Sequence, residues 1–150
     1  MVYQFGKVKA QRAKRQQPNK GHAAPRPANQ EPPIQAVQGM TPGSVQEWRV
    51  ALALIKLGIE FEFQKPIGGG RRVRGGQVID FWIYTAPYPT PCFVQGEYWH
   101  NRKTEAEDTL KQERVQRRYK GQVMPNLILE EKDLSSANAA YTLLRRKLIG

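Results

Sequence analysis

Apolar and polar positions recur with different periods along the chain, and the changes of period predict its elements. Between residues 44 and 57, apolar residues return every three or four positions, as in an amphipathic helix, and Gly58 ends the pattern. The stretch 59–65 alternates apolar and polar residues, which is typical of a strand with one exposed face. Two apolar runs, 78–84 and 92–100, flank a turn rich in proline and tyrosine and predict two further strands.

The C-terminal third carries weaker patterns. Residues 104–120 contain many strong helix formers, so we expect a helix with a narrow apolar stripe. The stripe consists of Leu110, Val115 and Tyr119. The short run 123–129 predicts a strand that Pro125 confines to a sheet edge or a bulge. A final helix should follow Asp133 and Ser135. Its expected buried face consists of Ala139, Leu143, Leu144 and Leu148.

The order helix, three strands, helix, strand, helix predicts a small mixed β-sheet flanked by helices, in the α/β or α+β class. Strands joined by short loops pair antiparallel, whereas the helix between the last two strands implies a parallel crossover. We expect this domain to occupy residues 41–150.

Residues 1–40 form a separate region in composition. Gln, Asn, Pro, Ala and basic residues dominate it, with seven lysines and arginines against one glutamate, so it should be a disordered basic arm when alone. Two interpretations remain: a solvated tail or linker, or an arm that orders along a phosphate backbone or within a larger assembly.

Length and charge limit the class of protein. A chain of 150 residues with a net charge of +11 has room for one small domain and an appendage, and it will gather near polyanions in a salt-dependent way. No apolar run approaches the roughly 20 residues that span a bilayer. The N-terminus also lacks the apolar core of a secretion signal, so we expect a soluble cytoplasmic protein without membrane contact. The single Cys92 cannot form an internal disulfide and should be a buried strand residue.

Asp80 is the focus of the candidate chemistry. Its neighbours are apolar on both sides, and a carboxylate there is costly to desolvate unless a cation or hydrogen bonds compensate it. A metal ion is one natural compensator. We expect the first of the two apolar strands to end near Asp80 and the second at His100. Glu47 has two interpretations: a helix-capping partner of Ser44, or an accessory acid pointing at Asp80.

A glycine-rich segment, residues 68–76, precedes the strand of Asp80. Its five glycines and three arginines predict a mobile, cationic loop. Arg71, Arg72 and Arg74 suit phosphate or groove contacts, and the alternative is a solvated hairpin loop. A Walker-type phosphate loop is not supported, because no Gly-Lys-Ser/Thr follows.

Residues 93–100 (FVQGEYWH) resemble the pattern Phe-Thr-His-Gly-Cys-Phe-Trp-His of the very-short-patch-repair mismatch endonucleases. Residues 78–81 (VIDF) are similar to the upstream strand of that family, which ends in Asp. These enzymes and the related EDxHD homing endonucleases of the phage type are a branch of the PD-(D/E)xK nuclease superfamily. The resemblance covers residues 44–134 and implies a restriction-endonuclease-like core.

By position, the resemblance implies that Asp80 binds a divalent metal, Mg²⁺ or Mn²⁺, with the backbone carbonyl of Val94 as a second ligand. It implies that His100 is the general acid or base beside the attacking water. Oxygen ligands suit such a hard cation, which polarises a phosphate and lowers the pKa of bound water. An imidazole moves protons at neutral pH.

The resemblance also implies further acids: Glu47 on the first helix, and Asp108 or Glu113 on the later one. Against the Glu-x-Lys motif of the superfamily, Gln95 stands where a metal-binding acid is expected, and Glu97 would supply that charge if it turned inward. We therefore count both among the candidate catalytic residues. Arg102 and Lys103, just beyond His100, are candidate nucleic-acid contacts. With one Cys and two His in the chain, no zinc is expected.

Three functional hypotheses follow. The first is a metal-dependent DNA endonuclease of phage or homing type, which nicks or cuts DNA in the host cytoplasm and can act as a homodimer. The second is a catalytically inactive nuclease-fold module that binds nucleic acid or builds a larger assembly. RNA is a third possible substrate, since phosphate contacts carry little identity.

Overall fold

The computed structural model describes residues 31–96 and 102–150, with the side chains of residues 102–104 left out. The elements are α2 (Val45–Leu57), β1 (Phe61–Ile67), β2 (Gln77–Ile83), β3 (Thr90–Gln95), α3 (Arg102–Arg118), β4 (Leu127–Glu130), a 3-10 turn η2 (Glu131–Asp133) and α4 (Ala137–Leu148). This is the order of elements that the periodicity predicts. None of the helices in this part of the chain has the length and apolar character that crossing a bilayer requires.

The four strands form one mixed sheet in the order β1-β2-β3-β4. The first three pair antiparallel and β4 pairs parallel to β3, which confirms the predicted topology. β4 lies at the edge of the sheet, as expected, but it begins only at Leu127. Pro125 therefore lies outside the strand, where its missing N–H breaks no ladder bond.

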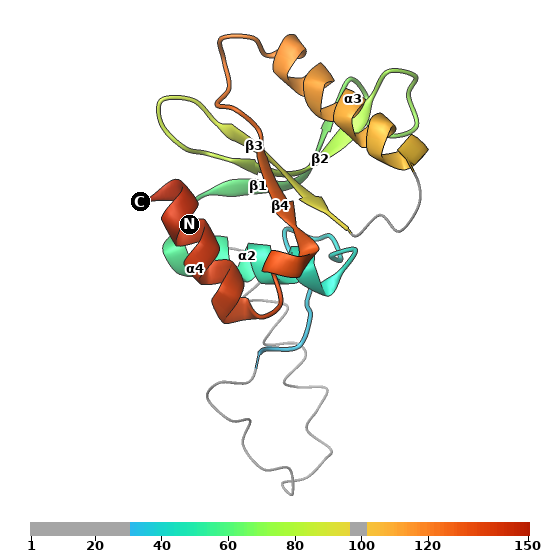
Figure 1. Cartoon of the computed structure of the whole chain (residues 1–150). Coiled ribbons are helices and arrows are strands. Elements are labelled where there is room, and N and C mark those ends of the chain that lie inside the picture. The colour runs from blue at the N-terminus through green and yellow to red at the C-terminus, as the bar shows by residue number, and fades with distance from the viewer. Residues whose placement is uncertain (1–30, 97–101) are drawn as a thin grey trace, which may run out of the picture.

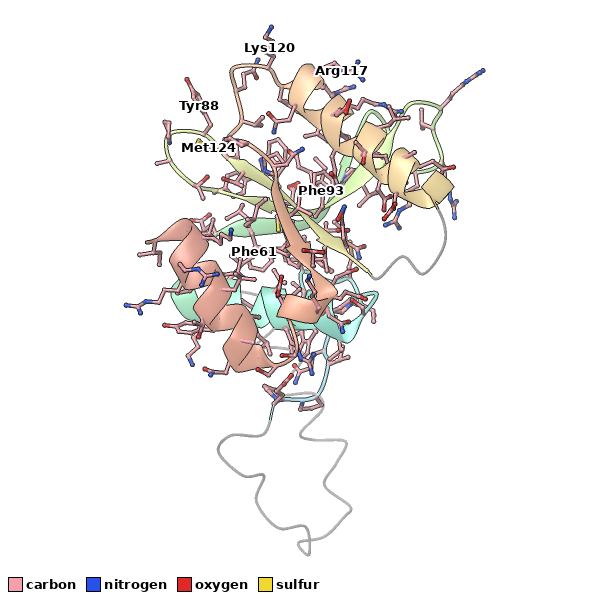
Figure 2. The ribbon with its side chains drawn as sticks, in the orientation of Figure 1. Phe61, Tyr88, Phe93, Arg117, Lys120 and Met124 are labelled. Carbon is pink, nitrogen blue, oxygen red and sulfur yellow. The ribbon has the colours of Figure 1, made fainter. Side chains whose placement is uncertain are left out.

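Helices cover both faces of the sheet: α2 and α4 lie on one side and α3 on the other (Figure 1). The larger core lies on the α2/α4 side. Its largest fully buried side chains are Trp48, Leu54, Phe63, Phe81, Ile83, Leu129, Leu134 and Leu144. The smaller core, on the α3 side, consists of Ile67, Ile79, Trp82, Phe93 and Val115. Figure 2 shows Phe61 and Phe93 on these opposite sides.

Helix α3 is attached to the sheet by few apolar contacts. Among the side chains of α3 that the structure describes, Val115 is the one that is fully buried. Tyr119, just beyond the helix, packs edge-on against Trp82. Leu110, which we expected in the apolar stripe, is 51% exposed. The prediction was wrong because Leu110 is five residues before Val115, a spacing that places the two on different faces of a helix.

The helix termini follow the sequence signals. Ser44 caps α2 by accepting a hydrogen bond from the Glu47 N–H at 3.2 Å, and Gly58 ends it with a left-handed φ of 72°. Ser136 caps α4 in the same way. The buried face of α4 is centred on Ala140 and Leu144, so Ala140 takes the place expected for Ala139.

Residues 31–40, which we assigned to the basic arm, pack against the domain. Val37 is buried, and Glu31 pairs with Arg49 at 3.0 Å. The Gln38 amide donates to Phe61 O at 2.7 Å and accepts from Phe63 N at 2.8 Å, so it covers the open edge of β1 as a strand would. The boundary at residue 40 was wrong, because these contacts join residues too far apart in sequence to leave a local pattern. Residues 1–30 lie outside the described part.

Two strand ends also differ from expectation. β2 continues through Asp80 to Ile83, since Phe81, Trp82 and Ile83 pair with strands on both sides. β3 ends at Gln95, before Gly96, rather than at His100.

Candidate functional site

Asp80 lies where the sheet is interrupted on both sides. The β1–β2 pairing runs through Phe63↔Phe81 and Lys65↔Ile79 but skips Gln64 and Asp80 between them. Gln64 has a φ of 52°, a left-handed conformation that costs free energy for a residue with a side chain. On the other side, the β2–β3 pairing stops at Phe81↔Cys92.

This break also changes which face the side chains take. Phe81 and Ile83 belong to the core under α2 and α4, whereas Ile79 and Trp82, three residues apart, both belong to the core under α3. Strict alternation along a strand would place them on opposite faces. Backbone irregularities that the surrounding structure maintains occur often at functional sites, which makes Asp80 the first candidate.

The carboxylate of Asp80 fills the gap between the strands. Its Oδ2 accepts a hydrogen bond from the Val94 N–H at 2.8 Å, in the place of a ladder bond. Burial raises the pKa of Asp80 from 3.8 to about 6, and this effect outweighs the Val94 hydrogen bond, which lowers it. The negative charges of Glu47 and Asp108 raise the same pKa further, and the Arg71 guanidinium lowers it. The carboxyl therefore exchanges its proton near neutral pH.

A cavity of about 510 Å³ opens beside Asp80, between β2, the end of β3, the loop 68–76 and α3. Its polar and charged lining residues are Arg71, Gln77, Asp80, Gln95, Asp108, Lys111 and Gln112. Two carboxylates and two basic side chains thus line the same cavity. A metal ion could bind to the carboxylates, and a phosphate could bind to the basic side chains.

Asp108 lines this cavity and Glu113 does not, so the structure favours Asp108 of the two acids left open by the sequence. Five residues separate them, which turns Glu113 away from the sheet.

Gln77 is a cavity residue that the sequence analysis missed. Only 4% exposed, it donates from Nε2 to the Lys111 carbonyl at 3.2 Å and so ties the start of β2 to α3. Its Oε1 is buried without a hydrogen-bond partner among the described residues. A buried amide oxygen in this state offers an acceptor to a water or a cation. No local pattern marks Gln77, because its importance comes from the helix that packs over it.

Arg71, Arg72 and Arg74 are all exposed, but of the three only Arg71 lines the cavity. The loop folds back on itself at Gly76. A Cβ there would overlap the Gly70 carbonyl and stand 2.7 Å from the Gly68 carbonyl, so a glycine is needed for the close approach.

Glu47 does not line the cavity, and its hydrogen bonds support the capping interpretation, while its role as an accessory acid stays a prediction. Its Oε1 accepts from the Gly43 N–H at 3.2 Å, while its own N–H donates to Ser44 Oγ. Capping holds this carboxylate at the start of α2, and only its charge reaches Asp80.

Gln95 lies between the Asp80 cavity and a second one of about 480 Å³. The second cavity is lined by Gln95, Gly96, Glu105, Thr109, Glu130, Glu131 and Lys132. Val94 contacts Asp80 through its N–H, and the role of its carbonyl as a metal ligand stays a prediction.

The remaining predicted site residues lie beyond what the structure describes. Glu97 and His100 fall in the gap 97–101, so their meeting with Asp80 stays a prediction. Arg102 and Lys103 are placed on the first turn of α3 by their backbone alone. Within residues 31–96 and 102–150, no three His, Cys, Asp or Glu side chains form a group that could hold one metal ion.

Cys92 is buried in β3, as predicted. Burial, aided by the nearby Asp80 charge, raises the pKa of its thiol well above the ordinary value. The thiol therefore stays protonated and is a packing residue rather than a nucleophile.

Comparisons of the chain with protein-family models, with curated proteins and with solved structures found no significant match.

Proposed function

We propose that this chain is a metal-dependent endonuclease that hydrolyses phosphodiester bonds of DNA in the cytoplasm, nicking or cutting it, as its resemblance to the homing-type nucleases implies. The observation that carries the proposal is Asp80, a desolvated carboxyl at a break in the sheet, in one cavity with Arg71 and Lys111. A site that brings an ionisable oxygen ligand and two phosphate-binding cations together suits phosphodiester chemistry.

The oxygen donors of the cavity fit Mg²⁺ or Mn²⁺. Asp80 supplies a carboxylate, Asp108 a second one, and Gln77 a buried amide oxygen without a partner among the described residues. When bound, such an ion polarises the phosphate and lowers the pKa of a bound water. Asp80 would hold the ion once it loses its proton, while Arg71 and Lys111 would orient the phosphate by charge.

A nicking assay on supercoiled plasmid, with Mg²⁺ or with EDTA, tests the proposal. Asp80→Asn should lower the cleavage rate by roughly 100-fold or more, because it removes the ligand charge and keeps a side-chain oxygen for the Val94 N–H. Asp133→Asn, which removes an exposed carboxylate of η2, is the control and should leave cleavage unchanged.

The loop offers a second matched pair. Arg71→Gln should slow cleavage, whereas Arg72→Gln, one residue away but outside the cavity, should not. His100→Ala tests the role that the resemblance implies for the imidazole. Cleavage that survives in Asp80→Asn at the wild-type rate would remove the basis of the proposal.

The second candidate is a nuclease-fold module that binds nucleic acid without cutting it. Gln95 favours it, because an uncharged amide lines the cavity at the position where the superfamily pattern has an acid. Salt-sensitive binding of DNA or RNA by wild-type protein, without Mg²⁺-dependent cleavage of either, is the result expected of such a module. Sedimentation of the same samples shows whether a homodimer forms.

A further inference from the structure

Charge is unevenly distributed along α3, which begins with Arg102 and Lys103. Its acids Glu105, Glu107 and Asp108 precede a strongly basic second half. The cations of that half and of the turn after it are Lys111, Arg114, Arg117, Arg118 and Lys120, with Glu113 as the acid among them. Such a half-helix repels itself unless an anion lies nearby.

Three of these cations share one flank of the helix. Lys111, Arg114 and Arg118 follow one another at three- and four-residue spacing, which aligns them. Two contacts show which way the flank faces. Lys111 lines the Asp80 cavity, and Arg118 Nη1 lies 3.5 Å from the point where a Cβ on Gly68 would stand. The flank therefore borders the loop 68–76.

We call Arg71, Lys111, Arg114 and Arg118 the cationic stripe. All four side chains are exposed. The ion pairs found among the described residues are Arg49–Glu31, Lys65–Glu62 and Lys132–Glu130, and none of them includes the stripe. Glu107, one turn before Lys111, is the acid of α3 that shares the flank. Arg71 also acts on the charge of Asp80. Because these two acids are fewer than the four cations, the stripe keeps a net positive charge for a ligand.

We propose that the cationic stripe holds the sugar–phosphate backbone of a nucleic acid where it leaves the Asp80 cavity. This inference rests on the proposed function and adds the path of the substrate strand. Lys111 and Arg118 are about 10 Å apart along the helix axis, a span that covers two or three phosphates of one strand.

The stripe fits a nucleic acid better than a membrane surface. An interfacial helix needs an apolar face beside its cations. The exposed large apolar residue of α3 is Leu110, one turn before Arg114, and a single leucine does not make an apolar face. The stripe instead continues into the polar cavity of Asp80, as a substrate channel does.

Helix α3 provides its own control. Arg114→Gln with Arg118→Gln removes two charges of the stripe. Arg117→Gln with Lys120→Gln removes two charges near the same end of the helix (Figure 2). Arg117 lies about 100° around the helix from Arg118, and Lys120 lies beyond the last turn. Both pairs change the net charge equally and remove cations near the same helix terminus, so their effects on folding should be similar. Circular dichroism of the full chain checks that both variants are folded.

The measurement is fluorescence anisotropy of a labelled DNA duplex and of the corresponding single strand, in EDTA, over a series of salt concentrations. Each phosphate contact contributes about 0.9 to the slope of log K against log salt. The stripe variant should lose about 2 units of slope and roughly 10- to 50-fold in affinity at 0.1 M salt. The control variant should stay within about 3-fold of wild type.

Equal losses in the two variants, or an unchanged slope in the stripe variant, overturn the stripe as a binding path. If the stripe variant loses binding to anionic phospholipid vesicles while its DNA binding is unchanged, the stripe is a membrane-binding surface, and the proposal is also overturned. Because EDTA prevents metal-dependent cleavage, these outcomes do not depend on catalysis. An inactive wild-type protein whose binding still needs the stripe would contradict the endonuclease and leave the stripe standing.

Discussion

The ionisation of Asp80 should make the stability of the fold depend on pH in an unusual direction. The folded protein holds the Asp80 proton more tightly than the unfolded chain does, since burial raises the pKa from 3.8 to about 6. The stabilising contribution of this proton is therefore complete below pH 3.8 and is lost as the pH rises through about 6. Carboxylates held in ion pairs usually have the opposite effect.

The pKa values set the size of this effect. A shift from 3.8 to about 6 makes the ionised carboxylate cost about 3 kcal/mol of unfolding free energy above pH 7. At about pH 4.5 the same linkage gives a cost of about 1 kcal/mol. Asp80→Asn removes the charge and keeps an oxygen for the Val94 N–H. The difference in unfolding free energy between Asp80→Asn and wild type should therefore shift by about 2 kcal/mol in favour of the variant from about pH 4.5 to about pH 8.

Urea unfolding of both proteins at these two pH values, followed by circular dichroism, measures the difference. The control Asp133→Asn, at an exposed carboxylate, should change stability by less than about 0.5 kcal/mol. A gap between Asp80→Asn and wild type that is the same at both pH values would refute the desolvation of Asp80. Millimolar Mg²⁺ at about pH 8 should stabilise wild type and not Asp80→Asn, because an ion that binds the folded state shifts the equilibrium.

Three substitutions test other parts of the structure. Gln38→Ala leaves the Phe63 N–H without its partner and should lower the free energy of unfolding in urea by about 1–2 kcal/mol. Gln38→Glu keeps an acceptor for this N–H and should lose less stability. Val115→Ala should cost about 2 kcal/mol and loosen α3, seen as faster amide exchange in that helix than in α4. Gly76→Ala should displace the loop at Gly70 and slow cleavage more than Gly75→Ala, which strains a φ of 81° but meets no neighbour within 4 Å.

The candidate site was only partly predictable. Asp80 and Arg71 stand out in the sequence, because an acid among apolar residues and arginines among glycines are unusual locally. Gln77 and Lys111 do not, since each matters only through contact with an element more than 30 residues away. Glu47 could not be decided from the sequence, because one carboxylate both accepts a hydrogen bond from the Gly43 N–H and acts on Asp80 through its charge.

The sequence by itself determined the order of helices and strands, the caps at Ser44 and Gly58, and the pairing directions of the sheet. These follow from hydrophobic periodicity, backbone preferences and loop length, which act over a few residues. Only the tertiary structure decided that Gln64 takes a left-handed conformation opposite Asp80, that Gln38 covers the edge of β1, and which face of α3 borders the loop. Those features are imposed by packing between distant segments, and no local pattern encodes them.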